Sequence, residues 1–183
     1  MDNQKTLLRN EIKQKLIKLT DEQRKNIQTA LQDELWKSPA WNQATVIGTT
    51  ISQRYEWNTK PIIREAWNQG KTVVVPKCNP KQKSLTFYQL EDFEQLETVY
   101  YQLQEPKPDK TKEVTSDTID LLIVPGLVFD LEHYRIGHGG GYYDRFLSNF
   151  NGTTLSIAWS GQVVHSIPIE PFDIPVTDLI VCS

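Results

Sequence analysis

The strongest constraint on the fold is an alternation of strand-like and helix-like segments that begins near residue 45. Residues 45–51 predict a strand, 59–70 a helix that opens on Thr-Lys-Pro, and 72–77 a buried strand with three consecutive valines. Two strands separated by a helix normally pair in parallel. We therefore expect an α/β protein, folded as a three-layer α/β/α sandwich with a largely parallel sheet.

The rest of the chain extends this alternation. The strand expected at 119–125 is apolar on both faces, as a central strand should be. The polar segment 105–116, which contains two prolines, is expected to be a surface loop. The other expected elements are a helix at 142–150 and strands at 84–90, 153–159 and 178–182.

Two helices are expected before this alternation, within residues 3–37. Apolar residues recur at helical spacing in each, and Thr20 with Gln23 has the spacing of a capping box at the start of the second. A chain of 183 residues suits one domain better than two. We therefore expect a single domain over 1–183, with the two helices at 3–37 and an α/β core at 45–183.

Composition limits the partners. The net charge of −3 gives no general attraction to nucleic acid or acidic membranes, and no apolar run approaches the roughly 20 residues of a membrane span. Cys78 and Cys182 have neither metal-site spacing nor a disulfide framework, which is typical of reduced thiols in the cytoplasm. We expect a cytoplasmic protein with small-molecule ligands and without nucleic-acid or membrane partners, monomeric, with a dimer as the alternative.

Glycines are concentrated in the segment Arg135-Ile-Gly-His-Gly-Gly-Gly-Tyr-Tyr-Asp-Arg145. It holds four of the nine glycines in the chain and lies between an expected central strand and an expected helix. Glycine lets backbone N–H groups approach a ligand without a Cβ in the way, and the start of a helix adds unpaired N–H groups. With Arg135 and Arg145 at its ends, the segment is typical of a phosphate-binding loop.

The glycine register fits neither of two common phosphate-binding motifs. A Walker A loop has Lys and then Ser or Thr after its last glycine, where this chain has Tyr142 and Tyr143, and the dinucleotide motif is G-x-G-x-x-G. A flexible glycine turn that binds nothing is the alternative interpretation. The charged and aromatic side chains that flank the glycines argue against such a turn.

This segment also resembles the motif of a known family. Pro125-Gly-Leu-Val-Phe-Asp130, followed by Arg135-Ile-Gly-His-Gly-Gly-Gly-Tyr-Tyr-Asp-Arg-Phe-Leu147, is similar to the motif of the 5-formyltetrahydrofolate cyclo-ligases, also called methenyltetrahydrofolate synthetases. The resemblance extends from Lys5 to the last expected strand. It implies an enzyme that converts 5-formyltetrahydrofolate to 5,10-methenyltetrahydrofolate, uses Mg-ATP, and releases ADP and phosphate.

The resemblance also implies roles for individual residues. The metal ligands for Mg²⁺ would be Asp144 and Asp173. Catalytic residues would be Arg135, Tyr142, Asp144 and Arg145. Residues that contact the folate substrate would be Ile51, Glu56, His138, Gly139, Gly140, Gly141 and Tyr142. Residues that bind ATP would be Lys5, Arg9, Arg135, Ile136, Gly137, His138, Gly139, Gly140, Gly141, Tyr142 and Tyr143.

The chemistry of these residue types suits those roles. Lys5 and Arg9 are four residues apart and share one face of a helix, although such a pair is by itself more often a solvated surface. A carboxylate such as Glu56 can accept hydrogen bonds from the N–H groups of a reduced pterin, and an apolar wall at Ile51 suits its flat ring. Tyr55 and Trp57 either extend that wall or are surface aromatics.

The chain departs from the family pattern at three positions. Phe172 stands where many members have His, Gly140 is Lys in some relatives, and His138 lies at a position that varies. Two other interpretations stay open. One is a protein that binds folate or nucleotide without turnover, which Phe172 favours. The other is a sugar-phosphate isomerase or CoA transferase of related fold that needs no ATP.

Overall fold

The structure is a computed structural model that describes all residues 1–183. Its centre is a seven-stranded sheet in the order β12-β10-β7-β1-β2-β3-β6. The five strands from β12 to β2 pair in parallel, and β3 and β6 continue the sheet in antiparallel pairing. These strands are β1 (Val46–Gly48), β2 (Thr72–Asn79), β3 (Ser84–Gln89), β6 (Lys112–Val114), β7 (Leu121–Ile123), β10 (Thr153–Trp159) and β12 (Asp178–Cys182).

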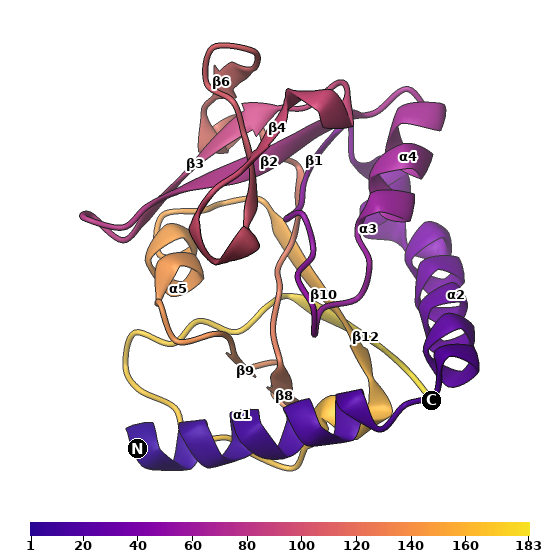
Figure 1. The fold of residues 1–183 in the computed structure, drawn as a ribbon, viewed down its shortest axis with the longest axis vertical. Coiled ribbons are helices and arrows are strands. Elements are labelled where there is room, and N and C mark those ends of the chain that lie inside the picture. The colour runs from indigo at the N-terminus through magenta and orange to yellow at the C-terminus, as the bar shows by residue number, and fades with distance from the viewer.

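Helices cover both faces of this sheet, so the expected largely parallel three-layer sandwich is confirmed. Successive side chains of a strand point to opposite faces, and on β2 Val73 and Val75 join the larger core cluster whereas Val74 joins the smaller one. Figure 1 shows the helices on opposite sides of the sheet. The larger cluster is covered by α2 (Asp21–Lys37), α3 (Pro39–Gln43) and α4 (Lys60–Asn68), and the smaller one by the short helix α5 (Tyr142–Leu147).

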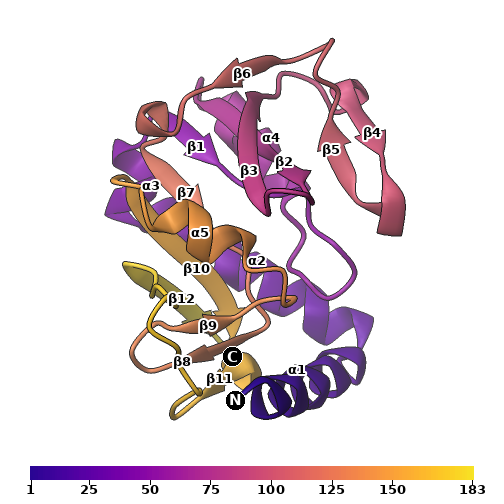
Figure 2. The ribbon, with the colours of Figure 1, turned by 90° about the vertical axis from the view of Figure 1, so that its left-hand side faces the viewer.

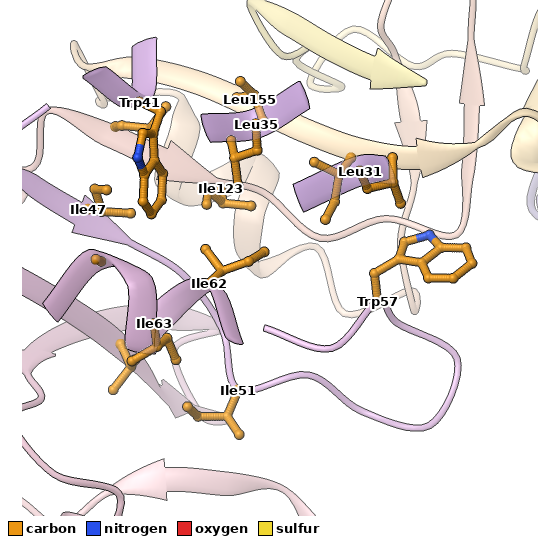
Figure 3. Close-up of a cluster of buried hydrophobic side chains, with 14 of the residues drawn as sticks. Leu31, Leu35, Trp41, Ile47, Ile51, Trp57, Ile62, Ile63, Ile123 and Leu155 are labelled. Atoms are coloured by element: carbon orange, nitrogen blue, oxygen red, sulfur yellow. The ribbon is translucent and has the colours of Figure 1, made fainter. Parts of the chain in front are cut away.

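The larger cluster is the main core. Trp41 of α3, Ile62 of α4 and Ile47 of β1 are fully buried there, between the helices and the sheet (Figure 3). The expected capping box is confirmed at the start of α2, where the Thr20 hydroxyl accepts from the Gln23 N–H and the Gln23 side chain accepts from the Thr20 N–H. This cap fixes the turn between the first two helices.

The first helix, α1 (Asp2–Ile17), lies beside a small second sheet (Figure 2). That sheet has the order β11-β8-β9, with β8 (Val128–Asp130), β9 (Arg135–Ile136) and β11 (Val163–Val164). Ile12 and Leu16 bury the inner face of α1 in the main core. Because β9 begins at Arg135, the glycine segment starts on a strand of this small sheet, close to α1.

Several sequence expectations differ from the structure. The strand expected at 119–125 is only Leu121–Ile123 long, and the helix expected at 142–150 ends at Leu147. The segment expected as a surface loop at 105–116 contributes to two strands, β5 (Gln104–Pro106), which pairs with β4 (Leu96–Thr98), and β6 at the edge of the main sheet. The strand expected at 45–51 is only Val46–Gly48 long, although the Thr49 N–H still donates to the Val74 carbonyl.

No helix is both long and apolar enough to cross a membrane.

Candidate functional site

The glycine segment begins on β9 and ends at the start of α5. Gly139 and Gly141 have φ of +104° and +71°, where a side chain would strain the backbone, and Gly141 is the N-cap of α5. A Cβ on Gly137 would meet no atom within 4 Å, so the space over this residue is open. Gly140 differs, because the Tyr142 ring lies where its Cβ would be, at 2.6 Å.

Helix α1 contacts the glycine segment through Arg9. Its Nε donates to the Gly137 carbonyl oxygen at 2.8 Å, and its Nη2 lies 3.5 Å from the position that a Cβ of Gly139 would occupy. A guanidinium is therefore held against the glycines that are predicted to bind phosphate. The structure brings together these three residues, which the sequence analysis placed in one ATP site.

One turn earlier, Lys5 reaches a different loop. Its Nζ lies 2.7 Å from Oδ2 of Asp173 and 2.9 Å from Oε2 of Glu170. Burial lowers the pKa of Lys5, but the hydrogen bonds and charges of the two carboxylates outweigh burial and raise that pKa above its ordinary value. Lys5 therefore stays an ammonium ion beside a residue that was predicted to bind metal.

The loop after β1 places Glu56 against the glycine segment. Oε1 of Glu56 lies 3.2 Å from Nε2 of His138, and Oε2 accepts a hydrogen bond from the Gln53 N–H at 2.7 Å. The Glu56 side chain is only 9% exposed, and Arg24 of α2 donates to its carbonyl oxygen. The loop that follows a parallel strand thus meets the glycine segment, as ligand sites of α/β sheets generally require.

Arg135 is buried inside the site instead of reaching outward. Its Nη1 lies 3.3 Å from Oδ1 of Asp144 and donates to the Ile174 carbonyl oxygen at 2.8 Å. Burial lowers the pKa of Arg135 and outweighs the opposite effect of Asp144, yet a guanidinium stays charged in a protein. Arg135 therefore joins the glycine segment to the loop that carries Asp173.

The two predicted metal ligands belong to neighbouring segments. The Ile174 N–H donates to Oδ1 of Asp144 at 3.2 Å, which brings Asp144 beside the residue that follows Asp173. No three His, Cys, Asp or Glu side chains converge as a metal site. Two carboxylates nevertheless suit Mg²⁺, which typically binds one or two protein carboxylates and completes its shell with phosphate oxygens and water.

Two other predicted residues lie in different surroundings. Ile51 is 7% exposed and packs in the main core, so little of it can touch a ligand. Arg145 is exposed on α5 and makes no ion pair or side-chain hydrogen bond. It therefore takes no part in the network formed by Arg9, Arg135 and Asp144.

The structure also places the aromatic candidates. Trp57 is neither a ligand wall nor a surface residue: it is 4% exposed and its Nε1 donates to Gln162 at 2.8 Å. Tyr55 is half-buried, with the Nζ of Lys13 5.3 Å from its ring centre. The buried Tyr143 hydroxyl has no hydrogen-bond partner, and burial raises its pKa well above its ordinary value.

Glu170 is the residue that the sequence analysis missed. It belongs to the segment Glu170-Pro-Phe-Asp173, in which only the aspartate was given a role. Its contact with Lys5 spans 165 residues, so no local pattern could predict it. An acid three residues before a predicted metal ligand was the only available signal.

The fold and the site define an α/β protein whose candidate phosphate-binding segment, between β9 and α5, meets the loop that follows the parallel strand β1. The model of the 5-formyltetrahydrofolate cyclo-ligase family matches residues 1–182. This chain belongs to that family of enzymes, as its glycine motif predicted.

Individual relatives agree with this assignment. The 5-formyltetrahydrofolate cyclo-ligase of Escherichia coli (strain K12) is 29% identical over 176 residues, which cover 94% of this chain and 97% of that protein. The NMR structure of Aquifex aeolicus 5,10-methenyltetrahydrofolate synthetase has a TM-score of 0.84 at 28% identity, over 97% of this chain and 89% of that one. The Mycoplasma pneumoniae 5,10-methenyltetrahydrofolate synthetase shares the fold, with a TM-score of 0.77 at 20% identity, over 96% and 97%.

Proposed function

We propose that this chain converts 5-formyltetrahydrofolate to 5,10-methenyltetrahydrofolate with Mg-ATP, releasing ADP and phosphate. Beyond the family membership, the observation that best supports this proposal is the contact between Glu56 and His138. It joins the loop predicted to bind folate to the segment predicted to bind ATP. Two substrates bound on these segments would lie next to each other, which a phosphoryl transfer between them requires.

The proposed reaction has two chemical steps. A formamide oxygen is a weak nucleophile and a poor leaving group, so the γ-phosphoryl group of ATP is first transferred to the formyl oxygen of the substrate, with release of ADP. N10 then attacks the activated formyl carbon and loses its proton, and the C–O bond to phosphate breaks. The phosphate ion leaves with the electron pair of that bond, and the ring is closed.

The protein contributes mainly position and charge to these steps. Arg9 lies on the glycine segment and would contact the nucleotide phosphates, together with the N–H groups around Gly137. Glu56 would accept hydrogen bonds from pterin N–H groups and so orient the formyl group.

Asp144 and Asp173 would hold the metal ion. Both supply the hard oxygen atoms that Mg²⁺ prefers, and Arg135 with the Ile174 backbone fixes the position of Asp144. When bound, Mg²⁺ offsets the negative charge of the phosphates. No side chain is assigned as a general base.

We further propose that the protein acts as a monomer in the cytoplasm on small molecules alone. The free thiols of Cys78 and Cys182 support a reducing compartment.

The metal role is tested with Asp144→Asn. This change keeps the shape of the side chain but removes one unit of charge, so we expect turnover to fall at least about a hundredfold, the scale of an electrostatic catalytic contact. Circular dichroism should show an unchanged fold. Asp178→Asn, at an exposed position at the start of β12, is the matched control and should keep full activity. Full activity in Asp144→Asn would refute its assigned role.

A further inference from the structure

Lys5 and the predicted metal ligand Asp173 satisfy each other's charge. Oδ2 of Asp173 accepts hydrogen bonds from the Lys5 ammonium at 2.7 Å and from the Glu170 N–H at 2.8 Å. The Lys5 and Asp173 side chains are only 11% and 9% exposed, so water screens their interaction weakly. A divalent cation that binds Asp173 must therefore compete with the Lys5 ammonium, which is already paired with this carboxylate.

Glu170 is the second carboxylate on Lys5, and its surroundings differ. Oε2 of Glu170 lies 2.9 Å from Nζ of Lys5, while its side chain is 32% exposed. Its side chain has no other hydrogen-bond partner in the structure. Glu170 can therefore keep Lys5 in place without the help of Asp173.

We propose that Glu170 is a positioning residue of this site, which holds the Lys5 ammonium while Asp173 binds the metal ion. This inference rests on the metal site of the proposed function. Without metal, Lys5 is shared between Asp173 and Glu170. When metal is bound, Asp173 is a metal ligand and Glu170 alone holds Lys5 at the edge of the site. There the Lys5 ammonium can pair with a phosphate of the nucleotide. Lys5 thereby competes with metal for Asp173, and Glu170 limits that competition.

The proposal predicts opposite effects of two substitutions in one cluster. Binding of Mn²⁺ alone, without nucleotide or folate, can be followed through the electron paramagnetic resonance signal of the free ion; Mn²⁺ accepts the same oxygen ligands as Mg²⁺. Lys5→Met should bind Mn²⁺ about tenfold more tightly than the unmodified protein, because Asp173 loses its competing ammonium. Glu170→Gln should bind it several-fold more weakly, because Lys5 then depends on Asp173 alone.

The double variant Lys5→Met/Glu170→Gln separates positioning from a general charge effect. If Glu170 acts through Lys5, Glu170→Gln changes Mn²⁺ affinity less than about twofold once Lys5 is gone. Lys15→Met is the matched control, since Lys15 lies on the same helix in an exposed pair with Glu11, and its Mn²⁺ affinity should not change. Thermal melts of all four variants confirm that each is folded.

Three results would overturn the proposal. They are unchanged or weaker Mn²⁺ binding by Lys5→Met, an equal effect of Glu170→Gln in both backgrounds, and no Mn²⁺ binding by any of the folded proteins. Because the assay contains no folate or ATP, its outcome is distinct from a failure of the proposed reaction, which would appear as absent turnover in the unmodified protein.

Discussion

Oε1 of Glu56 lies 3.2 Å from Nε2 of His138, and this contact joins two segments that are 82 residues apart in the sequence. Glu56 belongs to the loop after β1, and His138 lies among the glycines before α5. In a cyclo-ligase, these segments are expected to carry the two substrates. A change at Glu56 should therefore affect folate more than nucleotide.

We expect Glu56→Gln to raise the KM for 5-formyltetrahydrofolate about tenfold or more, since a hydrogen bond to a charged group contributes roughly 1.5–3 kcal/mol. The KM for ATP should change little. Steady-state kinetics with each substrate varied in turn measure both values. Glu113→Gln, at an exposed position of the edge strand β6, is the control and should leave both unchanged. An unaltered folate KM in Glu56→Gln would count against the folate role.

Two glycines of the loop should respond differently to alanine. Gly137→Ala places its methyl group in open space and at an ordinary φ, so the free energy of unfolding should hardly change while the KM for ATP rises. Gly141→Ala forces a side chain into a φ of +71° and should cost about 1–2 kcal/mol of stability. Urea unfolding and kinetics of both variants test this. An unchanged ATP KM in Gly137→Ala would argue that the open space does not face the nucleotide.

Replacing Arg135 and replacing Arg145 should have different effects on the free energy of unfolding. Arg135→Met leaves the Ile174 carbonyl without its donor and Asp144 with only the Ile174 N–H, so the free energy of unfolding should fall by about 1–3 kcal/mol. Arg145→Met removes an exposed side chain without such contacts and should stay within about 0.5 kcal/mol. Equal unfolding free energies for the two variants would contradict the structural role given to Arg135.

Cys78 should react slowly with alkylating reagents. Burial, together with the neighbouring carboxylate of Glu105, raises the pKa of the Cys78 thiol to about 11. Because only the thiolate reacts, alkylation at pH 8 should be about two orders of magnitude slower than that of a free thiol, whose pKa is about 8.5. The rate should still rise between pH 9 and about 11. Mass spectrometry of a Cys182→Ser variant isolates this thiol, and a rate that levels off near pH 9 would refute the shift.

Local patterns were enough to predict the parallel sheet. The apolar runs within Thr72–Asn79 and at Leu121–Ile123 predicted strands that are buried on both faces. The structure has strands at these positions, and their central residues are buried. Strand β6 could not be predicted in this way. Its Lys112 and Glu113 are exposed, and it is a strand because its backbone pairs with β3 at the edge of the sheet.

Residues of the candidate site could be proposed from the sequence, whereas most of their contacts could not. The motif around Gly137–Gly141 and its resemblance to the cyclo-ligases pointed to Arg9, Glu56 and Asp144. The pairing of Lys5 with Glu170 and the burial of Trp57 could not be inferred, because both depend on segments more than 100 residues away. Such contacts are set by packing of the whole fold, which no local spacing encodes.

The most direct test of the central claim is a turnover assay of the purified protein with 5-formyltetrahydrofolate, with and without Mg-ATP. The account predicts that the absorbance of methenyltetrahydrofolate appears only when ATP is present, with one ADP released for each product molecule. Product formed without ATP, or no product from folded protein with both substrates and Mg²⁺, would contradict it.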